Sequence, residues 1–125
     1  MSKTSSVTAS VVDFIDSAQL DKFPEESLVI GKRCIIDGLG VMLAGSTQPA
    51  GELIRSFVSG QGANKQSTAF GSSALNTTAS NAALINGTSG HALDWDDTQL
   101  ATSADRIFGL LTHPTIPPLV AALAI

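Results

Sequence analysis

Apolar residues recur at helical spacing along most of this chain, and this pattern limits the fold to helices packed on helices. The longest such stretch begins at Phe23-Pro24, where proline fits a first helical turn and two glutamates complement the positive end of the helix dipole. It extends to about Ala44, and Gly38 and Gly40 within it indicate close approach of a neighbouring helix or backbone. Its predicted core residues are Leu28, Cys34, Ile35, Leu39, Met42 and Leu43.

Shorter segments predict the remaining elements. We expect further helices over Val7–Ser17, over Pro49–Ser59, from Thr77 to about Ala92, and after His113-Pro114. In the helix over 49–59, the residues expected to point inward are Leu53, Ile54, Phe57 and Val58. Asn76 suits the N-cap of the helix that follows it. With one possible extended segment near 67–71, the sequence predicts a mostly all-α fold.

Composition excludes several classes of protein. With 43% hydrophobic and 14% charged residues, the chain can bury a core and is not of the disordered type. A net charge of −4 argues against a nucleic-acid partner, which rewards clustered Lys and Arg. The single cysteine, Cys34, cannot form an internal disulfide and is expected to be a small buried apolar residue in a reducing compartment. Without a secretory signal or a long apolar run, a cytoplasmic location without membrane attachment is expected.

The last residues predict that the chain is part of a longer protein. Ile116–Ile125 reads as an apolar helix that stops without a cap, a basic last turn or a polar tail. Natural C-termini are usually exposed. We therefore expect residues 1–125 to form a partial helical domain that is truncated at its C-terminus.

The residues with the most chemistry lie in the segment NGTSGHALDWDDT, which covers residues 86–98. His91, Asp94, Asp96 and Asp97 fall within seven residues, and His113 follows directly before a proline. Imidazoles and carboxylates move protons near neutral pH, so this is a candidate catalytic cluster. The alternative is structural, because acidic residues after a helix also accept backbone N–H bonds in turns. The only tryptophan, at position 95, is expected to be core or pocket wall.

Metal and cofactor signals are weak. Asp94, Asp96, Thr98 and Asp105 imitate the first, third, fifth and twelfth places of a calcium loop, but Gln99 stands where that loop requires glycine. No zinc spacing of histidines or cysteines supports His91. No phosphate-binding or dinucleotide-binding glycine motif is present. The sequence therefore predicts no metal and no cofactor.

These segments together resemble one enzyme family. The string NGTSGHALDWDDT, followed by His-Pro before an apolar helix, is similar to the MmgE/PrpD family, as are the earlier segments IDGLGVMLAGS and STAFG. The family includes 2-methylcitrate dehydratase, cis-aconitate decarboxylase and iminodisuccinate epimerase. The resemblance, which begins at about Val11, implies a helical domain and a separate lid domain, the latter absent from this chain. It also implies small polycarboxylate substrates and a homodimer without a metal.

The resemblance also implies roles for individual residues. Asp94 and His113 match catalytic positions, Thr98 and His91 match substrate-binding positions, and Asp96 and Asp97 match supporting positions. The shared chemistry would be proton removal next to a carboxylate, followed by loss of water, loss of CO₂ or reprotonation. The link between Thr98 and His113 is longer here than in the dehydratase and decarboxylase members.

Charge leads us to expect little activity from this chain alone. Arg106 is the only basic residue after Lys65, so clustered carboxylates would repel an anionic substrate. The alternative from another class is a non-catalytic helical interaction module that associates through exposed apolar helix faces.

Overall fold

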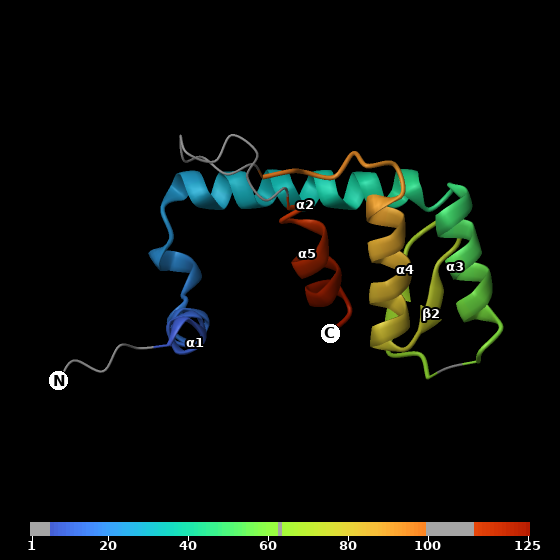
Figure 1. The fold of residues 1–125 in the computed structure, drawn as a ribbon, viewed down its shortest axis with the longest axis horizontal. Coiled ribbons are helices and arrows are strands. Elements are labelled where there is room, and N and C mark those ends of the chain that lie inside the picture. The colour runs from blue at the N-terminus through green and yellow to red at the C-terminus, as the bar shows by residue number, and fades with distance from the viewer. Residues whose placement is uncertain (1–5, 63, 100–111) are drawn as a thin grey trace. The chain divides into compact units, whose positions relative to one another are not determined.

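The computed structural model describes residues 6–62, 64–99 and 112–125. The chain divides into two compact units, Met1–Gly31 and Lys32–Ile125. The described part contains five α-helices, one 3₁₀ helix and a two-stranded sheet, which confirms the mostly all-α prediction (Figure 1).

The first unit contains α1 (Val7–Ser17), a short 3₁₀ helix (Leu20–Lys22) and the first turns of α2 (Glu25–Gly45). The side chain of Ser6 caps α1 by accepting a hydrogen bond from the N–H of Ala9 at 3.2 Å. The rings of Phe14 and Phe23 pack edge to face, with centroids 6.4 Å apart. The predicted bounds of α1 are confirmed.

Helix α2 was predicted almost to its last residue, but its buried stripe is narrower than predicted. Met42 is fully buried, whereas Ile35 and Leu43 are exposed, so those two core predictions are wrong. Cys34 is half-buried rather than buried. The reason is that only one side of the C-terminal half of α2 is covered, where Val41 and Met42 pack with Ile116 and Val120 of α5 (Ile116–Leu123).

Close packing against α2 uses two glycines. A Cβ on Gly38 would lie 2.6 Å from Cδ2 of Leu119 in α5. A Cβ on Gly45 would overlap the carbonyl oxygen of Ser89 in α4 (Ala79–His91). The predicted close approach is therefore confirmed at Gly38, whereas Gly40 has open space around it and that prediction is wrong.

Helix α3 (Pro49–Ser59) has the predicted bounds, but it also buries fewer residues than predicted. Val58 is buried and Ile54 is half-buried, whereas Leu53 and Phe57 are exposed. Val58 and Ile54 pack with Ala69 of the hairpin and Ile85 of α4. This second core lies on one side of α3 only.

The hairpin consists of β1 (Ser67–Ala69) and β2 (Leu75–Thr77), paired antiparallel with Ser67 opposite Thr77. The predicted extended segment is confirmed, but β2 was not predicted. Asn76 lies in β2 and is not the helix cap, because Thr78 takes that place and accepts a hydrogen bond from the N–H of Asn81 at 3.3 Å. Strand pairing thus uses the residues that had been expected to begin the helix.

Helix α4 lies between α3 and α5 and also packs against the hairpin (Figure 1). The buried Asn86 links α4 to the hairpin. Its Oδ1 accepts a hydrogen bond from the N–H of Phe70 at 2.8 Å, and its Nδ2 donates one to the carbonyl of Thr68 at 3.1 Å. These bonds satisfy backbone groups on the free edge of β1. Helix α4 is therefore held by α3, α5 and the hairpin. Within the described ranges, we find no helix with the length and apolar character needed to cross a membrane.

Candidate active site

The end of α4 places the first site residues. His91 is the last residue of α4, and the N–H of Asp94 donates to its carbonyl at 3.1 Å. Asp94 adopts a left-handed backbone with φ of 55°, a conformation that aspartate tolerates better than most residues. This turn ends the helix and directs the chain toward Asp96 and Asp97.

Two contacts bring the second histidine to the same place. Gln99 and Thr112 form an isolated antiparallel bridge, with N–H to carbonyl distances of 2.9 and 3.3 Å. The carboxylate of Asp97 accepts from the N–H and the hydroxyl of Thr115, at 3.1 and 2.6 Å. His113 lies between these two attachments, so the length of the link before it does not set its position.

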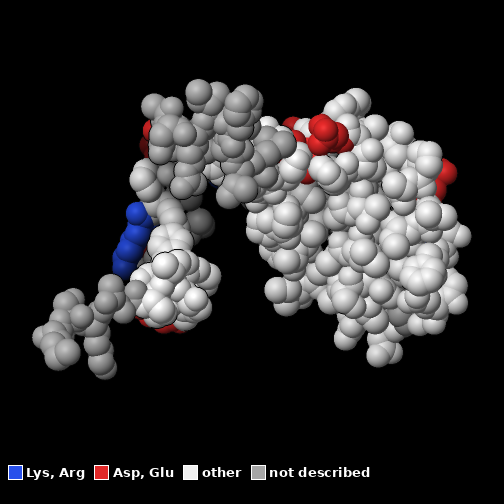
Figure 2. All heavy atoms as spheres, in the orientation of Figure 1, with Lys and Arg blue, Asp and Glu red and all other residues white. Residues whose placement is uncertain are grey.

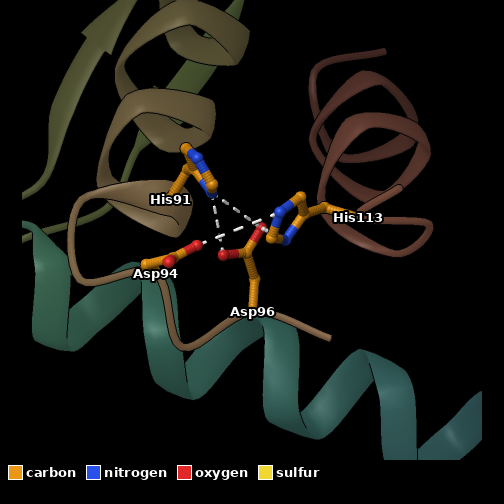
Figure 3. Close-up of side chains that lie close together, drawn as sticks. All are labelled: His91, Asp94, Asp96 and His113. Carbon is orange, nitrogen blue, oxygen red and sulfur yellow. Dashed lines mark hydrogen bonds and ion pairs between the residues drawn. The ribbon is translucent and has the colours of Figure 1, made fainter. Parts of the chain in front are cut away.

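Four side chains converge at this point (Figure 3). Asp96 lies between the two imidazoles: Nδ1 of His91 is 3.0 and 3.2 Å from its carboxylate oxygens, and Nδ1 of His113 is 3.2 Å from Oδ2. Nε2 of His113 is 3.9 Å from Oδ1 of Asp94. The two rings meet edge to face with centroids 4.6 Å apart. The structure thus assembles His91, Asp94, Asp96 and His113 from two segments of the chain.

The four groups differ in exposure. The side chain of Asp96 is 2% exposed, and that of His113 is 23% exposed. The side chains of His91 and Asp94 are 56% and 79% exposed. The buried carboxylate of Asp96 therefore lies at the centre of the cluster, in contact with both imidazoles, and Asp94 is the group most accessible to a molecule from solution.

Electrostatics favour a charged His91. The hydrogen bond with Asp96 raises the pKa of His91 above its ordinary value, and the negative charge of Asp96 acts in the same direction. Burial lowers this pKa, and the charge of Asp94 makes the smallest contribution to raising it. In the described ranges, no Lys or Arg forms an ion pair with either carboxylate. Figure 2 shows acidic atoms gathered over the segment that follows α4, and among the described residues no basic atoms lie beside them on that face.

His113 has an unusual environment. Its Nδ1 is buried and close to Asp96, yet the angles do not make a hydrogen bond, and no other described residue supplies one. A buried ring nitrogen without a partner is costly in a folded protein. The site therefore holds one unused nitrogen lone pair or N–H next to a buried carboxylate.

An open cavity of about 560 Å³ adjoins the cluster. It is lined by Gly87, His91, Asp96, Thr112, His113, Ile116, Pro117 and Val120. Its floor is mostly apolar, and its polar groups come from the cluster. This arrangement suits a small molecule that presents a polar group to the imidazoles.

The remaining predicted residues are placed differently. Asp97 lies at the start of α5, with Thr115 as its partner. Thr98 is exposed and is not among the described residues that line the cavity. Trp95 is 67% exposed, so its assignment to core or pocket wall is wrong.

One residue of the site was not predicted from the sequence, and two predicted residues lie outside the described ranges. Thr115 was missed, because its two hydrogen bonds to Asp97 span 18 residues and have no local sequence signal. Asp105 and Arg106 lie outside the described residues.

A family model described as the MmgE/PrpD N-terminal domain matches residues 9–122. No curated protein and no solved structure matches the chain significantly.

Proposed function

Because this chain belongs to the MmgE/PrpD family, we propose that it supplies proton-transfer groups of a lyase or isomerase that acts on small polycarboxylates. The first step is removal of a proton from the carbon next to a carboxylate. The reaction is completed in one of three ways: the leaving hydroxyl takes up a proton and departs as water, CO₂ is lost and protons return to the carbon skeleton, or a proton returns to the same carbon. The protein is proposed to act in the cytoplasm as a homodimer.

The proximity of Asp94 and His113 is the observation that supports this proposal. Their 3.9 Å separation joins an accessible carboxylate to a half-buried imidazole at the rim of a cavity. In such a pair, one group can act as the general base that accepts the proton, and the other as the general acid that donates a proton to the leaving group or to carbon. The distance is longer than a hydrogen bond, as is common before a substrate draws catalytic groups together.

The neighbouring residues have supporting roles in this proposal. Asp96 orients the imidazole of His91 through a hydrogen bond, in the way that buried carboxylates orient catalytic histidines, and its charge lies 3.2 Å from Nδ1 of His113. Asp97 fixes the segment that carries His113 through its two bonds to Thr115. His91 lines the cavity and, when protonated, offers a positive charge to a substrate carboxylate. Thr98, which is exposed and is not among the residues that line the cavity, is proposed to donate a hydrogen bond to the substrate.

The charge of the site limits what this chain does alone. Among the described residues, the two carboxylates have imidazoles as their only ionic partners, and such a site repels a polyanionic substrate. Guanidinium and ammonium groups are the usual partners of substrate carboxylates. We therefore propose that further cations complete the site, from Arg106 or from other polypeptide, and that the chain alone has little activity.

Deuterium exchange tests the proposal at its first step. The protein translated from the complete reading frame is incubated in D₂O with 2-methylcitrate or cis-aconitate, and NMR follows deuterium entering next to a carboxylate. Asp94→Asn and His113→Gln are each expected to slow exchange by about 100-fold or more, the usual contribution of a general acid or base. Glu52→Gln, on the surface of α3, is the control and is expected to leave the rate unchanged.

Two results would contradict this account. Wild-type rates in both site variants would overturn the assignment of the proton-transfer groups. Rapid exchange by the 125-residue chain alone would overturn the argument that cations are missing.

A second candidate function, a helical interaction module, is favoured by one observation. Leu53 and Phe57 are 74% and 61% exposed on α3. They line an apolar cavity of about 470 Å³ together with Ala50, Ile54 and Thr88. Exposed apolar patches of this kind mark association sites. If the module is the function, Leu53→Ser with Phe57→Ser will abolish self-association in sedimentation experiments, and the site variants above will show no loss because there is no exchange to lose.

A further inference from the structure

We propose that His91, Asp94, Asp96 and His113 form a binding site for a divalent transition-metal ion of the zinc class. Each residue offers one ligand atom, and the four atoms lie within 4.8 Å of one another. Neither the spacing along the chain nor the family assignment implies such a site.

The separations fit tetrahedral coordination. With metal–ligand bonds of about 2.0–2.2 Å, neighbouring ligand atoms in a tetrahedral site lie about 3.3–3.6 Å apart. Nδ1 of His91 and Nδ1 of His113 lie 3.0 and 3.2 Å from carboxylate oxygens of Asp96. The 3.9 Å separation to Asp94 belongs to the other ring nitrogen of His113, Nε2, so Asp94 must move to reach an ion held by Nδ1. The largest adjustment falls on His91 and Asp94, whose exposed side chains can move at low cost.

Charge and hydrogen bonding also favour a cation. Two ionised carboxylates carry a charge of −2, and in the described ranges no Lys or Arg neutralises them. A divalent cation is attracted to this pair of carboxylates. It would also give the buried Nδ1 of His113, which has no hydrogen-bond partner, a bond to make when that nitrogen is the ligand.

The ligand types point to the class of ion. Two imidazoles with two carboxylates suit zinc and neighbouring first-row metals, whereas calcium and magnesium prefer all-oxygen sites. Asp97 and the Gln99–Thr112 bridge hold the segment that carries His113, which supplies the outer support that metal ligands require. His113 lies far along the chain from the other three ligand residues, and this explains why a search for short ligand motifs does not find the site.

The ion would also regulate the activity proposed above, a consequence that rests on that proposal. Bound metal occupies the lone pairs of Asp94 and His113 that proton transfer needs. Metal in excess is therefore expected to inhibit deuterium exchange. Binding itself is measured without substrate, so its failure and that of the proposed function are distinguishable.

Cobalt(II) is the probe, because four-coordinate Co²⁺ absorbs visible light much more strongly than the hexa-aqua ion. The untagged chain is titrated with Co²⁺, and Zn²⁺ is then added as a competitor. We expect a four-coordinate spectrum that Zn²⁺ abolishes. Asp96→Asn and His113→Ala are expected to weaken binding at least tenfold, since even the loss of outer support costs 10–100-fold.

Matched variants and a second measurement complete the test. Cys34→Ser removes the only thiol and Glu52→Gln removes a carboxylate on α3, and both are expected to bind Co²⁺ as the wild type does. The chain has two histidines, so Zn²⁺ should shift the ring protons of both in NMR spectra. If circular dichroism shows that Asp96→Asn is unfolded, the exposed His91→Gln replaces it. No four-coordinate spectrum, binding unchanged in the ligand variants, or binding lost in Cys34→Ser would each overturn the proposal.

Discussion

The carboxylate of Asp97 accepts two hydrogen bonds from Thr115, a residue 18 positions later, one from its N–H at 3.1 Å and one from its hydroxyl at 2.6 Å. Thr115 directly precedes α5, so the carboxylate lies at the positive end of that helix. A single acidic side chain therefore joins the segment after α4 to the start of α5. His113 lies two residues before this attachment.

Removing this carboxylate should destabilise the fold. Asp97→Ala is expected to lower the free energy of unfolding by about 1.5–3 kcal/mol, the usual range for hydrogen bonds to a charged group. Thr115→Val keeps the backbone donor and should cost less. Urea denaturation of the single and double variants measures the coupling, and additive losses would show that the two residues act independently.

The charge state of His91 should depend on Asp96 more than on Asp94. Asp96→Asn is expected to lower the pKa of His91, because the hydrogen bond and the charge of Asp96 are the main causes of its rise. Asp94→Asn should lower it less. NMR titration of the His91 ring protons measures both effects, and an equal or larger decrease in Asp94→Asn would contradict this ranking.

The same interaction should make stability depend on pH. The pKa of His91 is raised in the folded state, so the folded protein retains the proton after the unfolded chain has lost it. Its contribution is full below the unfolded pKa of about 6.5 and is lost as the pH rises through the folded value. Denaturation midpoints of the wild type and His91→Gln should therefore converge from pH 6 toward pH 9. A difference that grows with pH would have the wrong sign.

Two glycines of α2 should respond in opposite ways to alanine. In Gly45→Ala the new methyl group meets the carbonyl of Ser89, so α2 and α4 must move apart at a cost of at least about 2 kcal/mol. Gly40→Ala meets nothing within 4 Å and should stabilise the helix by about 0.5–1 kcal/mol. Thermal and urea denaturation compare the two, and similar losses in both would contradict the packing described here.

Helix positions followed from local signals, whereas burial did not. Proline at the start of α3 and the acidic first turn of α2 act within one helical turn, so sequence alone located both helices. Leu53 and Phe57 were predicted inward because they are apolar, but only one side of α3 is covered here. Strand β2 was missed because it depends on pairing with β1, and a run of three residues has little signal of its own.

The site was only partly predictable for a similar reason. The residue types of His91 and Asp96 indicated proton chemistry, and their closeness in sequence made contact plausible. The position of His113 depends on Gln99, Thr112 and Thr115, whose contacts span many residues. No local pattern encodes such contacts. The catalytic, substrate-binding and supporting roles stay predictions.

The pairing of Gln99 with Thr112 has a consequence for how the sequence of this chain can vary. A loop whose ends are joined becomes less favourable only slowly as it grows, by about 0.6 kcal/mol for each doubling of its length. Insertions between the two paired residues can therefore accumulate while the imidazole of His113 keeps its position beside the carboxylates of Asp94 and Asp96. Natural diversification, or a designer who grafts a new segment there, could reshape the approach to the cavity without rebuilding its chemistry.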